Sequence, residues 1–299
     1  MKIAIDKKVK TQKKRKEGEK NIPRHEIIKH KYIEKYPIKY FINPKEEAFL
    51  IIGTAYPCCC NTDYKKEPTK RFLCDFFYGN DYTIWELLRL TKLVKFPELG
   101  LVRQSHENHE NKENEYAKKV IELLKINNVA FSDIFSTFQR MDNSACTPDN
   151  FNIDACTFNT NIMETIKGTE NINTIFFTSD DTRKFFTKYI YNRYLQENNI
   201  NFIPRNLPIL DEQEIKIKLN DLRAGSVFFS NPNTSYFQRK IKFVTLPSPA
   251  ATGGINQNQE WYRNILYENP DLDFYDAKVE YYKKAFDGVF KISETSKNL

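Results

Sequence analysis

Residues 76–88, FFYGNDYTIWELL, place aromatic, amide and carboxylate side chains directly before an apolar helical segment. A tyrosine such as Tyr78 can stack on a planar group, and the side chains of Asp81 and Asn80 can orient a water molecule. Simpler interpretations stand beside these: Asp81 can cap the start of the helix, and the aromatic rings can pack in the core. The segment forms a site only if other elements bring polar groups to the same place.

The elements that could do so are predicted by the hydrophobic pattern. Four continuous apolar runs predict buried strands, because a strand covered on both faces lacks alternating polar residues. The runs cover residues 48–53, 129–135, 174–179 and 242–248. Helical patterns cover residues 83–94, 114–127, 180–198, 258–268 and 276–290. This alternation predicts an α/β fold, a three-layer α/β/α sandwich with a central four-stranded parallel sheet.

Two regions depart from the alternation. Residues 200–240 contain Pro and Asn punctuation and short alternating runs, which predict a β-rich insertion before the fourth strand. Residues 1–40 hold 14 basic and 5 acidic side chains, a charge of +9, so residues 41–299 carry −2 of the total of +7. We therefore expect a basic N-terminal arm at 1–40 and a single domain at 41–299. The arm is suited to bind a polyanion, or it only solubilises the chain.

The candidate site lies where the predicted strands end, because parallel sheets bind ligands at the carboxyl ends of their strands. Those ends carry the loops GTAYP (53–57), DIFSTFQR (133–140), TSDDTR (178–183) and LPSPAATGG (246–254). Thr178 and Ser179 can hold an anion or can simply cap the helix that follows. Asp133 is expected to make a structural hydrogen bond, and the histidines, including His30, are expected to have no catalytic role.

Composition argues against several other classes. No apolar run approaches the roughly 18 residues of a membrane helix, and no secretory signal is recognised, so we expect a cytoplasmic protein without a membrane partner. The six cysteines include the triplet Cys58–Cys60 but no C-x-x-C pair, so no metal site is predicted. No cofactor is expected either, and neither Gly-rich phosphate loop occurs, which disfavours a nucleotide-dependent enzyme. The protein is expected to be a monomer.

Five segments, in their order along the chain, resemble the uracil-DNA glycosylase superfamily, and most closely its hypoxanthine- and mismatch-specific branch. They are FLIIGTAYP, FFYGNDYTIWELL, VAFSDIFSTFQRMDNSACTPDN, TIFFTS and LPSPAATGG, and the resemblance covers residues 47 to about 265. It implies a monofunctional DNA glycosylase without metal or cofactor. Such an enzyme flips a base out of DNA, hydrolyses its N-glycosidic bond and leaves an abasic site.

The resemblance also implies which residues form the site. Asp81, with Asn80 as second candidate, would orient the attacking water, and Tyr78 would stack on the flipped base. The residues implied to contact the base are Gly53, Thr54, Tyr56, Phe77, Tyr78, Ser144, Asp149 and Ser179. The residues implied to contact DNA are Thr178, Arg183, Pro247, Ser248 and Pro249.

Three positions depart from the family pattern. Tyr82 stands where the related branch has its catalytic Asn, the GTAYP loop has no acidic or amide side chain, and Leu246 replaces the His of uracil-specific enzymes. The departures favour a non-standard base over plain uracil. The expected substrates are hypoxanthine or uracil, or a hypermodified cytosine such as a glucosylated hydroxymethylcytosine in phage DNA, which would make this an antiviral defence enzyme. The alternative is a non-catalytic nucleic-acid-binding module of the same fold.

Overall fold

The structure is a computed structural model, and its described residues cover much of the predicted domain. They are residues 27–55, 76–78, 84–95, 109–139, 151–191, 193–194, 224–229, 239–249 and 260–290. Within these ranges, no helix combines the length and the apolar character that crossing a membrane requires.

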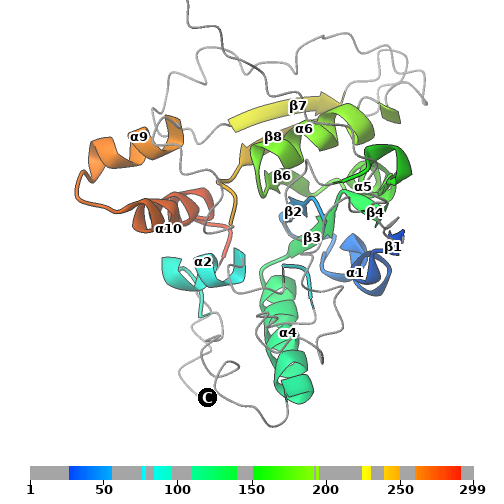
Figure 1. Cartoon of the computed structure of the whole chain (residues 1–299), viewed down its shortest axis with the longest axis horizontal. Coiled ribbons are helices and arrows are strands. Elements are labelled where there is room, and N and C mark those ends of the chain that lie inside the picture. Colours follow the sequence, from blue (N-terminus) through cyan, green and yellow to red (C-terminus); the bar gives the residue numbers. More distant parts are fainter. Residues whose placement is uncertain are drawn as a thin grey trace, which may run out of the picture.

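Among the described residues, five strands form one sheet in the order β3-β2-β6-β8-β7 (Figure 1). They are β2 (Ala48–Gly53), β3 (Val129–Asp133), β6 (Ile172–Phe177), β7 (Ala224–Phe229) and β8 (Arg239–Thr245). The pairs β2–β3, β2–β6 and β6–β8 are parallel, and β7 lies antiparallel to β8. The predicted four-stranded parallel sheet is therefore confirmed, and β7 extends it at one edge.

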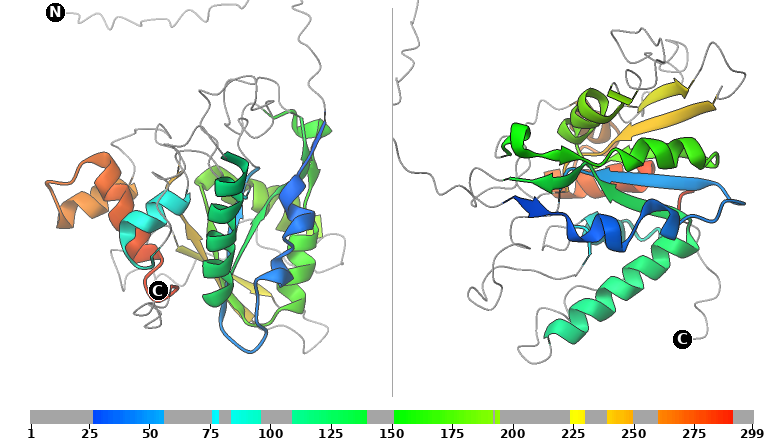
Figure 2. Two further views of the ribbon diagram at one scale, coloured as in Figure 1. Left: turned by 90° about the horizontal axis from the view of Figure 1, so that it is seen from below. Right: turned by 90° about the vertical axis from the view of Figure 1, so that its right-hand side faces the viewer.

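Helices flank this sheet (Figures 1 and 2). They are α1 (Lys31–Lys35), α2 (Ile84–Thr91), α4 (His109–Ile126), α5 (Asn161–Gly168), α6 (Asp180–Phe185), α9 (Glu260–Glu268) and α10 (Phe274–Ala285), with the 3-10 helices η1 (Ile38–Tyr40) and η5 (Ile153–Ala155) and the π-helix η6 (Phe186–Tyr191). Phe176 and Phe177 are neighbours on β6, so their side chains point to opposite faces. Phe176 stacks on Phe286, which follows α10, and Phe177 packs on Phe186 of η6, with ring centroids 4.4 and 5.2 Å apart.

The predicted helices at 83–94, 114–127, 258–268 and 276–290 are confirmed as α2, α4, α9 and α10, with ends that differ by a few residues. Helix α10 begins after Asp273 because this residue caps it. The Asp273 side chain accepts a hydrogen bond from the Asp276 backbone N–H at 2.8 Å. Ala277 and Tyr281, four residues apart, are buried on one face of this helix. The segment predicted as one helix over 180–198 instead changes from α6 to the π-helix η6 at Phe186.

A second sheet has the order β1-β4-β5. β1 (Ile28–Lys29) and β5 (Thr157–Phe158) lie antiparallel on either side of β4 (Phe135–Phe138). The chain leaves the central sheet after Asp133, passes Ile134 and enters this second sheet. The prediction of one strand over 129–135 is therefore wrong at its end, because a continuous apolar run does not reveal a bend.

Residues 27–40 belong to the folded body of the protein. Tyr32 of α1 and Ile38 of η1 are buried in the hydrophobic core. β1 pairs with β4, with Ile28 opposite Phe138, and Figure 2 shows β1 and α1 in blue alongside the strands. The boundary of the basic arm at residue 40 is therefore too late in the chain, because net charge does not show which apolar residues become buried.

Of the predicted β-rich insertion at 200–240, β7 and the start of β8 lie in the described ranges. β7 is the edge strand of the central sheet, paired with β8 so that Val227 lies opposite Ile241. The rest of the insertion lies outside the described residues.

Candidate functional site

The candidate site lies at the carboxyl end of β2. From β2 the chain continues to β3 on one side, and β6 later takes the other side. In parallel sheets such a reversal opens a crevice beyond the strand ends, and ligands bind there. The end of β2 is Gly53, which lies beside Asp133 of β3, while Thr178 follows β6 and donates its backbone N–H to the carbonyl of Ile52 at 3.0 Å.

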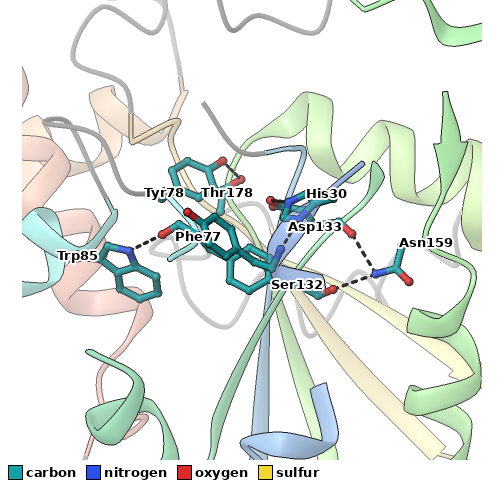
Figure 3. A network of polar contacts seen from close by, with 9 residues as sticks. His30, Phe77, Tyr78, Trp85, Ser132, Asp133, Asn159 and Thr178 are labelled. Carbon is teal, nitrogen blue, oxygen red and sulfur yellow. Dashed lines mark hydrogen bonds and ion pairs between the residues drawn. The ribbon is translucent and has the colours of Figure 1, made fainter. Parts of the chain in front are cut away.

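A buried histidine and aspartate form the centre of this site (Figure 3). His30 Nε2 lies 2.7 Å from Asp133 Oδ2, and both side chains are 0% exposed. His30 Nδ1 accepts a hydrogen bond from the Tyr32 backbone N–H at 3.2 Å. The proton of the imidazole is therefore assigned to Nε2, which donates it to the carboxylate.

The short strand β1 brings His30 to this position. Lys29 pairs with Thr137 of β4, and the His30 backbone N–H donates to the Ser136 carbonyl at 2.8 Å. The imidazole also packs against the rings of Phe77 and Phe138, with centroids 5.4 and 6.4 Å away. Backbone pairing and aromatic packing together fix the ring against the end of β3.

The second carboxylate oxygen of Asp133 has a different environment. Oδ1 is buried and has no hydrogen-bond partner among the described residues. It lies over Gly53, where an added Cβ would be 2.1 Å from Asp133 Oδ1 and 2.7 Å from Tyr78 Cε2. A side chain at position 53 is thus excluded, and the glycine lets the carboxylate and the tyrosine ring approach the end of β2.

Tyr78 lies in a turn that α2 holds in place. Trp85 Nε1 donates to the Phe77 carbonyl at 2.7 Å, and this hydrogen bond ties the turn at residues 76–78 to the start of α2. Tyr78 has a φ of 54°, an uncommon conformation for a bulky residue, and its ring packs on Phe131 at 5.7 Å. Backbone conformations of this kind occur often at functional sites.

Hydroxyl groups form a cluster next to Tyr78. The Tyr78 hydroxyl lies 2.8 Å from Thr178 Oγ1. Thr182 Oγ1 lies 2.7 Å from Thr54 Oγ1 and 2.9 Å from Ser179 Oγ, and it lies 3.4 Å from Thr178 Oγ1. This hydroxyl cluster joins the ends of β2 and β6, and both Thr178 and Thr182 are fully buried.

The start of α6 satisfies its own polar groups. The Ser179 side chain accepts from the Thr182 backbone N–H at 3.1 Å and so caps the helix. Arg183 Nη2 donates to Asp180 Oδ1 at 2.9 Å. Ser179 therefore caps α6, as the helix-cap interpretation predicts, and Arg183 is paired with Asp180 of the same helix.

The loop after β8 is anchored by two tyrosines of α10. Tyr281 donates its hydroxyl to the Thr245 carbonyl at 2.7 Å, and Tyr282 donates to the Pro247 carbonyl at 2.8 Å. Burial, followed by the neighbouring Tyr78 hydroxyl, raises the pKa of Tyr282 well above its ordinary value, so this phenol stays protonated as a donor. Ser248, at the end of the anchored part, is partly exposed.

The structure brings together only part of the implied site. Gly53, Tyr78 and Thr178 meet at the end of β2, whereas Phe77 is fully buried and packs on Phe131 with centroids 4.9 Å apart. Pro247, Ser248 and Pro249 follow β8, and the first two of these residues leave the sheet beside the tyrosines of α10. The implied residues outside the described ranges are Tyr56, Asn80, Asp81, Ser144 and Asp149.

The sequence reasoning predicted a structural hydrogen bond for Asp133, and the bond to His30 confirms it, but the sequence reasoning did not identify His30 as the partner. A signal existed for Asp133, because it opens the second strand-end loop; its position as the last residue of β3 places it beside Gly53. His30 gave no comparable signal. It lies 103 residues from its partner and within a segment whose basic charge dominated the interpretation.

The arrangement combines a buried carboxylate oxygen that can accept a hydrogen bond, a partly exposed tyrosine, and a glycine on which these two side chains pack closely. In the described part of the chain, no three His, Cys, Asp or Glu side chains are grouped so that they could hold a metal ion. The chain matches no family model, no curated protein and no solved structure, so this site is the basis on which a function can be proposed.

Proposed function

We propose that the protein is a monofunctional DNA glycosylase that hydrolyses the N-glycosidic bond of a flipped base and leaves an abasic site. The observation that carries the proposal is the meeting of Gly53, Tyr78 and Asp133 at the carboxyl end of β2. A flipped base is held by an aromatic face and by hydrogen bonds to its edge. The tyrosine ring and the carboxylate oxygen that lacks a partner within the described residues supply one group of each kind.

The order of the motifs supports the same reading. In the proposal, Asp81 orients the attacking water, with Asn80 as the second candidate, and both follow Tyr78 closely in the chain. The site architecture is that of a three-layer α/β/α sandwich, with the β-rich insertion entering before β8. Ser248, partly exposed in the loop after β8, contacts a DNA phosphate, and the basic residues near the N-terminus add charge that attracts the DNA backbone.

An abasic-site assay tests the proposal. Purified full-length protein is incubated with end-labelled DNA that carries one uracil, hypoxanthine or modified cytosine, and alkali then cleaves at abasic sites. Asp81→Ala is expected to lower the excision rate at least about 100-fold with DNA binding retained, because general acid–base groups contribute about 10²–10⁴-fold. Asp154→Ala, which removes an exposed carboxylate in η5, is the matched control.

The assay also separates the alternative function. A non-catalytic nucleic-acid-binding module would bind all these DNAs without forming an abasic site in any of them, whether or not Asp81 is present. If the wild-type protein makes no abasic sites on the whole panel yet binds DNA, the glycosylase proposal is overturned in favour of the binding module.

A further inference from the structure

The second carboxylate oxygen of Asp133 points to a substrate class, an inference that rests on the proposed function. We propose that Asp133 Oδ1 accepts a hydrogen bond from the exocyclic amino group of the flipped base, and that His30 positions the carboxylate for this contact. The substrate is then an aminopyrimidine or aminopurine, such as a modified cytosine, and not uracil or hypoxanthine.

The first step is the missing partner of Oδ1. Asp133 is 0% exposed, and within the described ranges only Oδ2 of its two carboxylate oxygens has a hydrogen bond, the one from His30. Buried polar atoms in folded proteins are almost always paired, and leaving a charged one unpaired is unfavourable. A bound group with an N–H donor would provide the missing hydrogen bond.

The second step is the type of donor. An ionised carboxylate only accepts hydrogen bonds, and Oδ2 already receives the proton of His30 Nε2. In uracil and hypoxanthine, the ring N–H lies next to a carbonyl group. If this N–H donated to Asp133 Oδ1, the carbonyl oxygen of the base would also approach the negative carboxylate and be repelled by it. The nitrogen of an exocyclic amino group is bonded to no carbonyl carbon, so the site favours cytosine- and adenine-type edges and repels lactam edges.

The third step is the role of His30. Its Nδ1 accepts a hydrogen bond from the Tyr32 backbone N–H and its Nε2 donates to Asp133 Oδ2, so neither ring nitrogen is available to a substrate. Its Nε2 instead fixes Oδ2, and this bond holds Oδ1 over Gly53 next to the Tyr78 ring. His30 is therefore a positioning residue that acts through Asp133.

The main experiment compares excision rates on two groups of substrates. The amino-bearing group is cytosine, hydroxymethylcytosine, its glucosylated form and adenine, and the lactam group is uracil and hypoxanthine. Asp133→Asn replaces one oxygen with an N–H₂ donor, and we expect it to shift the preference towards lactam bases by about 10- to 100-fold, the range of one hydrogen bond to a charged acceptor. Ser132→Ala, a buried change on the neighbouring residue, should leave the preference unchanged.

Variants of His30 provide a second route if Asp133→Asn fails to fold. His30→Ala should reduce the preference for amino-bearing bases, whereas His30→Gln, which keeps an N–H donor, should restore much of it. A purely structural role of His30 would lower the rates on all substrates equally and leave their ratio constant. Thermal unfolding of each variant shows how much folded protein contributes to each rate.

Calorimetric titration with free cytosine, adenine, uracil and hypoxanthine separates this inference from the proposed function. Excision of uracil or hypoxanthine as fast as any amino-bearing base, or an unchanged ratio in Asp133→Asn, overturns the inference and leaves the glycosylase standing. If no substrate yields abasic sites, the glycosylase proposal falls. Binding of cytosine or adenine that depends on Asp133 then still supports the recognition contact, and equal binding of all four bases overturns it.

Discussion

Two buried polar side chains at opposite ends of β3 make different use of their hydrogen-bonding capacity. Asn128, just before the strand, is saturated: its Oδ1 accepts from the Asn43 backbone N–H at 2.6 Å, and its Nδ2 donates to the carbonyls of Asn43, Glu46 and Glu47 at 3.2, 3.0 and 2.8 Å. Asp133, at the other end, uses one carboxylate oxygen and leaves the other without a partner in the described part of the chain.

The difference separates a structural group from one that is available to a ligand. A buried side chain with all its hydrogen bonds made holds neighbouring segments in place and has nothing left to bind with. A buried carboxylate with one free oxygen is unfavourable for the folded protein alone, and such exceptions concentrate at functional sites. The amino end of β3 is therefore expected to determine stability, and its carboxyl end to determine function.

The largest expected effect is that of Asn128→Asp. The substitution replaces an amide that donates to three carbonyl oxygens with a group that only accepts, and it keeps a residue type that tolerates the φ of 55° at this position. We expect the free energy of unfolding to fall by about 3–4 kcal/mol, measured by urea denaturation. Asn171→Ala, an exposed amide that also donates to the Asn43 carbonyl, should cost less than about 1 kcal/mol.

Activity completes this test. The excision rate per folded molecule should not change in Asn128→Asp, because the side chain lies at the end of the sheet away from the site. Two results would contradict the proposed difference between the two ends of β3. One is an Asn128→Asp variant as stable as the wild type, and the other is a variant that folds but excises more slowly per folded molecule.

Gly53→Ala is the next largest change. Its Cβ would lie 2.1 Å from Asp133 Oδ1, so the carboxylate or the strand end must move. We expect excision to slow about 100-fold, since displacing a site by about 1 Å has this effect, and stability to fall by about 1–3 kcal/mol. The control is Gly168→Ala, where an added Cβ meets no atom of the described residues within 4 Å. Equal rates in the two variants would show that the close packing of Asp133 and Tyr78 on Gly53 does not matter for excision.

Lys278 extends the comparison of Asn128 and Asp133 to a buried group that carries a positive charge. It is 1% exposed on α10, and burial lowers its pKa from 10.5 to about 8. The unfolded chain holds this proton more tightly, so the charge destabilises the folded state at neutral pH, and stability rises as the pH increases from 8 to 10.5. Lys278→Met should raise the free energy of unfolding at pH 7 by about 2 kcal/mol.

The pH dependence decides this prediction. In urea denaturation at several pH values, the advantage of Lys278→Met over the wild type should shrink as the pH rises above 8 and nearly vanish near 10.5. A constant difference across this range would mean that packing, and not the buried charge, is responsible.

The smallest effect is expected for Tyr78→Phe, which keeps the ring and removes the hydroxyl bonded to Thr178. We expect a loss of about threefold to tenfold in excision and less than about 1 kcal/mol in stability. Thr178→Val should have a similar effect, and the double variant should add little, because each change removes the same hydrogen bond. Full additivity would show that the two hydroxyls act independently.

The sequence was sufficient to predict the parallel sheet and the edge at which the candidate residues Gly53 and Thr178 meet. Runs such as 48–53 are apolar throughout, which is the pattern of a strand covered on both faces, and this element is found at Ala48–Gly53 as predicted. Since parallel strands end at one edge, the apolar runs by themselves predict that Gly53 and Thr178 come together.

The rest depended on contacts that leave no local pattern. Phe77 and Tyr78 are adjacent aromatics, yet Phe77 is fully buried, whereas Tyr78, with its left-handed backbone, is partly exposed. The run 129–135 hides the turn at Ile134 that makes Asp133 the end of its strand. The partner of Asp133 comes from a two-residue strand that no periodicity could reveal.

That two-residue strand makes the N-terminal segment 27–40 an integral part of the domain. It supplies the imidazole that is bonded to Asp133 as well as core side chains. A protein shortened at residue 41, an attractive boundary if only charge is considered, would lose this imidazole and, with it, the hydrogen bond to Asp133 Oδ2. Because Tyr32 and Ile38 of the same segment belong to the hydrophobic core, the shortened protein would lose core packing together with the imidazole.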